Sequence, residues 1–120
     1  MGVGMPADIY LHEFGSQVWH AFGTPPYHVG SSLTLKSGWR DVDVRLILAD
    51  DEYAAWGLGK PNLSRQNGKW VALCLAFSAL GQHMTGLPID FQIQQQTRAN
   101  EEFPREHPRS ALGIVALRFV

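Results

Sequence analysis

The sequence has little of several features that define particular protein classes. Its 120 residues include one cysteine, Cys74, which excludes an internal disulfide framework. No stretch approaches the roughly 20 consecutive apolar residues of a membrane-spanning helix. The first residues, Met1-Gly2-Val3-Gly4-Met5, lack the basic and apolar regions of a signal peptide. We therefore expect a cytoplasmic protein that makes no use of a membrane.

The chain also lacks an excess of charge of one sign. Ten Lys and Arg residues stand against 11 Asp and Glu residues, and the formal net charge is −1. Without a broad basic field, extensive nucleic acid binding is not expected, and a small substrate fits the charge better. With 45% hydrophobic and 18% charged residues, the chain has a globular composition and the size of one domain, residues 1–120.

What the sequence does contain is a series of helix and strand patterns. Apolar residues at helical spacing predict two long helices, at 8–22 and at about 70–83. Shorter helical segments are expected at 32–37 and after Asp50, which reads as part of a helix cap. Strand patterns occupy residues 27–29, 41–48 and 89 to 94 or 95. Residues 60–68 read as an exposed loop and 97–109 as a polar tail, and 114–120 fits a terminal strand or a partner-facing segment. The predicted class is α+β, with a small mixed sheet and helices packed on one of its faces.

Three aspartates lie on two of these strands. Asp41 and Asp43 alternate with Val42 and Val44, so both carboxyl groups point to one face, with Cα atoms roughly 6.5 Å apart. Asp90 joins them if its strand pairs alongside. Aspartate is disfavoured in strands, and paired carboxylates suit the two cations of phosphoryl-transfer sites. A sheet with one solvent-exposed face gives the same alternation, so the pattern alone leaves both interpretations open.

Together with the preceding Gly-Ser turn, these acids resemble a known signature. Gly30-Ser31, a nine-residue spacer, the Asp41-Val-Asp43-Val strand and the later Ile-Asp90-Phe strand resemble the nucleotidyltransferase superfamily that includes DNA polymerase beta. The chain is most similar to the small stand-alone members of actinobacteria and their phages, over residues 27–112. The resemblance implies a minimal nucleotidyltransferase fold. It also implies transfer of a nucleoside monophosphate from a nucleoside triphosphate to an acceptor hydroxyl, dependent on Mg²⁺ or Mn²⁺.

The resemblance also implies roles for the matching residues. Asp41 and Asp43 would hold the metal that carries the triphosphate, and Asp90 would complete a second metal site and help to deprotonate the acceptor. Three such close acids repel one another, so at least one pKa should be raised in the absence of cations.

Several further residues are candidates for contact with the nucleotide. Glycine permits close backbone approach, and exposed amides favour anions, so the turn after residue 29 could cradle phosphate. Basic residues nearby could also meet phosphate, although Arg45 could equally form a structural ion pair with an acid. The histidines read as structural or exposed residues and the tryptophans mostly as core residues, although His28 could touch a ligand and Trp39 could stack on a base. The nucleotide-binding candidates are Gly30, Ser31, Ser32, Lys36, Arg40 and Arg45.

The chain departs from the family pattern in two respects. Arg40 stands where the family has a serine, and no length remains for the helical domain that binds the base or acceptor in larger relatives. Acceptor choice would therefore come from homodimerisation, a partner, or the tail at 104–109. Three hypotheses remain: a minimal nucleotidyltransferase, an inactive nucleotide-binding or regulatory module of antitoxin-like type, and a phage-encoded protein that interacts with a host target.

Overall fold

The computed structural model describes residues 3–35, 37–102 and 107–113. Within them a four-stranded mixed sheet has the order β3-β2-β1-β4. Strands β2 and β3 are parallel, whereas β1 pairs antiparallel with both β2 and β4. The strands are β1 (Tyr27–Val29), β2 (Val42–Leu48), β3 (Ile89–Gln95) and β4 (Ser110–Ala111).

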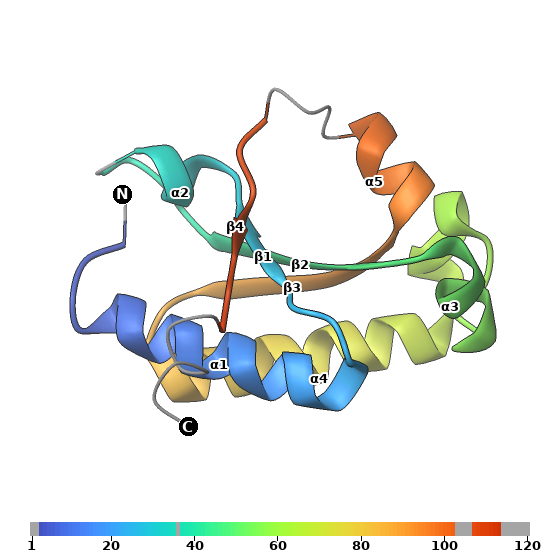
Figure 1. Ribbon diagram of the computed structural model, residues 1–120, viewed down its shortest axis with the longest axis horizontal. Coiled ribbons are helices and arrows are strands. Elements are labelled where there is room, and N and C mark those ends of the chain that lie inside the picture. Colours follow the sequence, from blue (N-terminus) through green and yellow to red (C-terminus); the bar gives the residue numbers. More distant parts are fainter. Residues whose placement is uncertain (1–2, 36, 103–106, 114–120) are drawn as a thin grey trace.

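Helices connect these strands and confirm the predicted α+β class. The helical segments are α1 (Ala7–Phe22), α2 (Ser31–Thr34), α3 (Asp50–Ala55), the 3-10 helix η1 (Pro61–Gln66), α4 (Gly68–Thr85) and α5 (Gln96–Glu102). The long helices α1 and α4 cover one face of the sheet, while α5 and the segment leading to β4 lie on the other side (Figure 1). Both long helices end at a left-handed glycine, Gly23 after α1 and Gly86 after α4, as their sequence patterns suggest.

The hydrophobic core lies between the sheet and the two long helices. Every second residue of β2 and β3 points into it, and α1 contributes Leu11, Phe14 and Val18. The ring of Phe14 meets that of Phe91 edge-on, with centroids 6.2 Å apart. Because strand side chains alternate, burial of this face places Asp43 and Arg45 of β2 on the opposite face.

Side chains of α4 bond the outer edge of β3. Trp70 Nε1 donates to the carbonyl of Ile93 at 2.7 Å, and the Ser78 hydroxyl accepts from the Phe91 N–H at 2.9 Å. Gln82 Nε2 donates to the carbonyl of Ile89 at 3.4 Å. Since these residues are four or eight apart, they share one side of α4. They protect an exposed strand edge and hold β3, with Asp90, in place.

The structure differs from the sequence analysis at two polar segments. Residues 61–66 form η1 rather than an irregular loop, and the polar tail begins with α5. Asp50, expected to cap its own helix, instead accepts hydrogen bonds from the N–H and hydroxyl of Thr97 at the start of α5. The predicted segment at 114–120 lies outside the described residues. In the part of the chain that the structure describes, no helix is long and apolar enough to cross a membrane.

Candidate functional site

The polar face of the sheet brings two of the three predicted acids side by side. In the parallel pair β2–β3, Asp43 lies directly opposite Asp90, and neighbouring strands are about 4.8 Å apart. The condition that the sequence required, a strand carrying Asp90 beside the strand carrying Asp43, is therefore met. Asp41 precedes the first residue of β2 and is exposed.

The Gly-Ser turn lies against the first member of this pair. Val29, the last residue of β1, is paired with Asp43, so the chain turns at Gly30 directly beside that carboxyl group. Gly30 has a φ of +80°, and a Cβ at this position would collide with Oδ2 of Asp43. Only glycine combines this backbone conformation with so close an approach. Ser31 follows at the exposed start of α2.

Arg45 joins the two acids. Its Nη2 lies 3.3 Å from Oδ2 of Asp90 and 3.7 Å from Oδ1 of Asp43. Its Nη1 donates to the main-chain carbonyls of Asp90 at 2.7 Å and Val44 at 3.2 Å. The residue is only 8% exposed. The structural ion pair that the sequence left open is thus present, and one guanidinium group serves both carboxylates.

The surroundings of Asp43 raise its pKa. Burial disfavours the charged carboxylate and is the largest cause, Arg45 opposes it, and the charges of Asp90 and Asp41 raise the pKa further. The direction is the one expected from three neighbouring acids. The main cause differs, because desolvation outweighs the repulsion between carboxylates.

Other predicted residues take different positions. The Ser32 side chain is fully buried, and its hydroxyl lies 2.7 Å from Nε2 of His28, so only its main chain is left for a ligand. His28 is paired with Val44 and therefore shares the core face, away from Asp43, which excludes the predicted contact with a ligand on the polar face. Arg40 is exposed, Trp39 is partly buried against the core, and Lys36 lies outside the described residues.

The donor atoms of this face suit a hard cation only in part. Among residues 3–35, 37–102 and 107–113, no three His, Cys, Asp or Glu side chains are grouped so as to hold a metal ion. Asp41 is therefore not grouped with Asp43 and Asp90 closely enough for all three to hold one ion. Asp43 and Asp90 still offer neighbouring carboxylate oxygens, and Mg²⁺ characteristically takes one or two protein carboxylates together with waters and substrate phosphates. These two residues fit such an ion if Arg45 shares or yields their oxygens.

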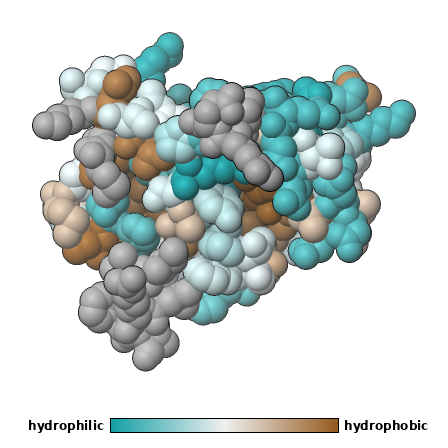
Figure 2. Space-filling model, turned by 45° about the horizontal axis from the view of Figure 1, so that its top comes forward, coloured by the Kyte–Doolittle hydropathy of each residue, from teal (hydrophilic) through white to brown (hydrophobic). Residues whose placement is uncertain are grey.

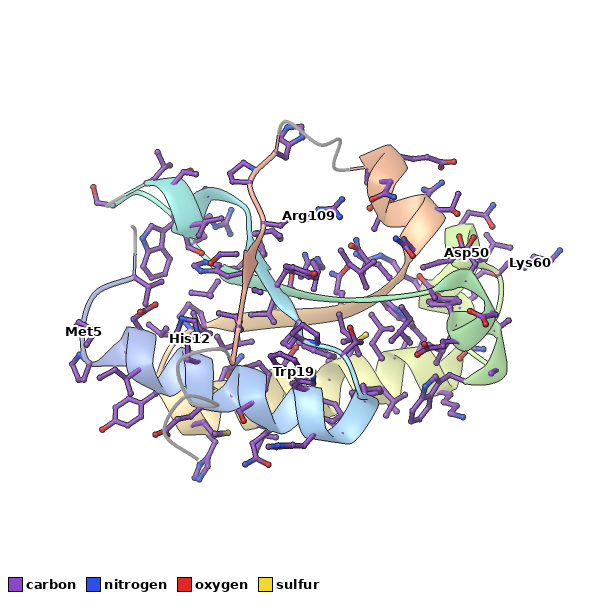
Figure 3. All side chains as sticks on the ribbon, in the orientation of Figure 1. Met5, His12, Trp19, Asp50, Lys60 and Arg109 are labelled. Atoms are coloured by element: carbon purple, nitrogen blue, oxygen red, sulfur yellow. The ribbon has the colours of Figure 1, made fainter. Side chains whose placement is uncertain are left out.

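The tail at 104–109 was expected as one source of acceptor choice, and its described part lies beside the Gly-Ser turn. His107, Pro108 and Arg109 line a cavity of about 260 Å³ together with Gly30 and Ser31. Figure 3 shows Arg109 extending toward α5, where its Nη2 donates to the carbonyl of Ala99 at 3.3 Å and to Oδ1 of Asn100 at 3.2 Å. The sequence shows two basic residues in this polar tail, but no pattern near them predicts that they lie beside the Gly-Ser turn.

Part of this face is polar, and its paired acids are accessible. With the side that bears α5 turned forward, Figure 2 shows mainly hydrophilic residues over the half of the molecule that carries α3 and α5. The side chains of Asp43 and Asp90 are 29% and 40% exposed, so a solute can reach both. The arrangement offers two reachable carboxylates, a buried cation between them, and a glycine turn where a ligand can approach the main chain. Comparison of the chain with protein-family models, with curated proteins and with solved structures finds no match.

Proposed function

We propose that the protein is a metal-dependent nucleotidyltransferase that moves a nucleoside monophosphate from a nucleoside triphosphate to an acceptor hydroxyl. The observation that carries this proposal is the direct pairing of Asp43 with Asp90, with Gly30 against Asp43. Phosphoryl transfer depends on positioning and charge neutralisation, and paired reachable carboxylates beside an open main-chain turn provide the elements for both.

The triphosphate would lie on the β1 side of the acids. The cavity lined by Gly30, Ser31, His107 and Arg109 combines exposed main chain with two basic residue types, which suits phosphate oxygens. Asp43 lies between this cavity and Asp90, since β2 separates β1 from β3. The reacting α-phosphorus would then be held over β2.

The acceptor would approach from the β3 side. Its hydroxyl oxygen forms a bond to the α-phosphorus. At the same time the bond from that phosphorus to the oxygen shared with the β-phosphate breaks, and pyrophosphate leaves. The hydroxyl proton passes to the carboxylate of Asp90, whose side chain is 40% exposed. Mg²⁺ or Mn²⁺ held by Asp43 and Asp90 would supply neutralisation of the negative charge on the phosphates.

Arg45 favours a second candidate function. Its single positive charge is shared between both carboxylates and offsets part of their repulsion. A chain that binds nucleotide without turnover, as a regulatory or host-interaction protein, has no need to release these acids. Nucleotide binding without transfer distinguishes this candidate from an enzyme.

The test is a labelling experiment on the purified protein. It is incubated with Mg²⁺, each α-labelled nucleoside triphosphate in turn, and a cell lysate as the source of acceptor. We expect label transfer by the wild type and its loss in Asp43→Asn, which preserves size and removes the charge. Asp51→Asn is the matched control, because Asp51 is an exposed acid of α3 away from the site.

Each outcome decides between the candidates. Transfer by the wild type and by Asp51→Asn, with loss in Asp43→Asn, supports the enzyme. Saturable nucleotide binding without transfer supports the non-catalytic candidate. Equal transfer by the wild type and Asp43→Asn contradicts the proposed role of the paired acids.

A further inference from the structure

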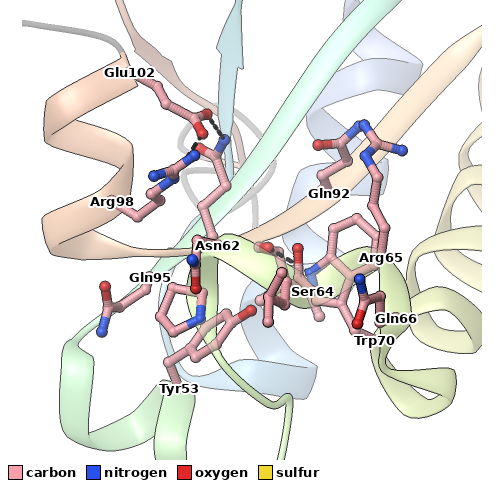
Figure 4. Close-up of a pocket in the computed structure, with 14 residues that line it drawn as sticks. Tyr53, Asn62, Ser64, Arg65, Gln66, Trp70, Gln92, Gln95, Arg98 and Glu102 are labelled. Atoms are coloured by element: carbon pink, nitrogen blue, oxygen red, sulfur yellow. Dashed lines mark hydrogen bonds and ion pairs between the residues drawn. The ribbon is translucent and has the colours of Figure 1, made fainter.

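A second cavity lies beyond Asp90 on the polar side of the sheet. It has a volume of about 340 Å³ and is enclosed by η1, the second half of β3, and α5. Figure 4 shows its side chains converging from these elements. This volume falls within the range of small-molecule sites. We call it the amide pocket, because five of its lining residues are Asn62, Gln66, Gln92, Gln94 and Gln95.

The amide pocket has unused hydrogen-bonding capacity. Oε1 of Gln94 is buried without a partner among the described residues, while its Nε2 donates to Glu102 at 3.3 Å. The side-chain amides of Asn62, Gln66 and Gln95 are exposed or partly exposed and make no hydrogen bond to a described residue. A buried acceptor without a donor is costly, so a ligand that brings hydroxyl or amine donors is favoured here.

The charges of the pocket are paired, apart from that of Arg65 at its rim. Arg98 and Glu102 form an ion pair at 3.0 Å, so their charges offset one another. Arg65 lies over the ring of Trp70, 5.9 Å from its centroid, at the exposed rim. The lining therefore offers many donors and acceptors but no unpaired acid.

The aromatic residues argue against a nucleobase in this pocket. Tyr53 and Trp70 line it but are only 2% and 5% exposed, and Trp70 Nε1 already donates to Ile93. Bases are commonly held by stacking on an accessible aromatic face, which this pocket does not offer, whereas the hydroxyl groups of a polyhydroxylated molecule can bond to its amides. The chemistry of the pocket thus resembles that of a sugar site.

Gln92 connects the pocket to the acids. It lines the amide pocket, and its Nε2 lies 3.5 Å from Oδ1 of Asp90. A groove that includes Asp90, Gln92 and Arg65 continues from the pocket. The sheet order places β3 on the opposite side of β2 from β1 and Gly30. A ligand here would reach Asp90 from the side away from the Gly-Ser turn.

We propose that the amide pocket binds the acceptor of the reaction, a neutral polyhydroxylated small molecule of sugar or cyclitol type, and presents one hydroxyl to Asp90. The assignment of the bound molecule as the acceptor rests on the proposed function. The binding of a neutral polyol depends only on the pocket. The two parts are therefore tested by different measurements.

The binding test uses amide chemical shifts of the ¹⁵N-labelled protein. Glucose, sucrose and myo-inositol are the neutral probes, gluconate and glucosamine the charged ones, and adenosine the nucleobase probe. We expect at least one neutral probe to give saturable shifts at residues of η1 and β3. Gln94→Met, which keeps the length but removes the amide, should weaken this binding about tenfold. Gln17→Met, on the exposed side of α1, is the matched control and should leave it unchanged.

Several results would overturn the inference. These are the absence of saturable shifts in the pocket with every neutral probe, tighter binding of a charged probe or adenosine there, or equal affinity in Gln94→Met and wild type. A spread of amide chemical shifts like that of the wild type shows that Gln94→Met is folded. If it is not folded, Gln95→Met provides a second test.

The labelling experiment separates this inference from the proposed function. Transfer that continues at the wild-type rate in Gln94→Met and Gln92→Met would overturn the acceptor assignment while the nucleotidyltransferase proposal stands. If a neutral polyol binds but no label is transferred to any acceptor, both the assignment of the polyol as acceptor and the proposed enzyme activity are overturned. The binding of a polyol in the pocket would still stand. Loss of transfer in Gln94→Met with nucleotide binding unchanged supports the whole inference.

Discussion

Gly30 and Asp43 are packed so closely that the glycine hydrogen occupies the space next to the carboxylate oxygen Oδ2. The contact joins the end of β1 to the second residue of β2, and it combines with a left-handed backbone at Gly30. A side chain at this position is opposed both by the backbone conformation and by the acid beside it.

We therefore predict that Gly30→Ala lowers the free energy of unfolding by about 1–3 kcal/mol, because it adds a collision to an unfavourable φ. Gly23→Ala is the matched control, since Gly23 has a φ of +78° but no described atom within 4 Å of its Cβ position. Urea unfolding of both variants separates the two costs. An equal loss in both would show that contact with Asp43 contributes nothing.

Replacement of Arg45 should reveal the repulsion between the acids. Arg45→Met removes the cation between Asp43 and Asp90, and we expect a loss of about 1–3 kcal/mol at neutral pH, reduced from a fully buried pair because both acids are partly exposed. If the two carboxylates then accept Mg²⁺ more readily, the ion should raise the melting temperature of the variant more than that of the wild type.

Arg45→Lys is the control for this experiment, because it keeps the charge and loses the planar fork. It should lose less stability than Arg45→Met in thermal unfolding without Mg²⁺. A methionine variant as stable as the wild type would contradict the structural role given to the ion pair.

His28 predicts a specific dependence of stability on pH. Burial lowers its pKa from 6.5 to about 4, and nearby Asp8 only partly opposes this. The unfolded chain therefore binds this proton more readily than the folded chain between these two values. The free energy of unfolding is therefore highest above about pH 6.5 and decreases as the pH falls toward 4. Protonation of His28 should account for a loss of about 2 kcal/mol between pH 7.5 and pH 5.

The measurement is urea unfolding at several pH values for wild type and His28→Gln. The variant should lose less stability on acidification by roughly this amount. His20→Gln, on the exposed side of α1, controls for the loss of a histidine. An unchanged pH dependence in His28→Gln would show that His28 is not held neutral by the fold.

Gly81 tests how closely α4 is packed on the sheet. A Cβ at this position would lie 2.9 Å from Cγ2 of Ile89 and 3.1 Å from Cζ of Phe14. We expect Gly81→Ala to cost about 1–3 kcal/mol despite the better helix propensity of alanine. Gly68→Ala in the same helix meets nothing within 4 Å and should be neutral or slightly stabilising. Denaturant unfolding of the two variants compares them, and equal stabilities would contradict the close packing.

Much of the fold was predictable because periodicity is a local property. The spacing of apolar residues predicted α1, α4 and the strands β2 and β3 close to their observed bounds. The short helices η1 and α5 were missed because they are polar and have no buried stripe. Their positions depend on distant contacts, such as the bonds from Thr97 at the start of α5 to Asp50.

The candidate site was predictable only in part. Alternation along β2 and β3 separated Asp43 and Asp90 from the apolar residues, and both do lie on the polar face. The same reasoning grouped Asp41 with them, whereas Asp41 lies just before the strand and the three acids form no group that could hold a metal ion among the described residues. The amide pocket had no local signal, because its residues come from three separate elements.

By itself the sequence determined which residues of each strand share a face, and it placed a glycine where the chain must turn beside an acid. Both follow from the geometry of a single backbone segment. The tertiary structure decided that Asp43 lies opposite Asp90, that Arg45 bridges them, and that Arg109 returns to the Gly-Ser turn. These relationships depend on strand register and on long-range packing of the core, and a shift of register by one residue would have separated the acids without changing the sequence pattern.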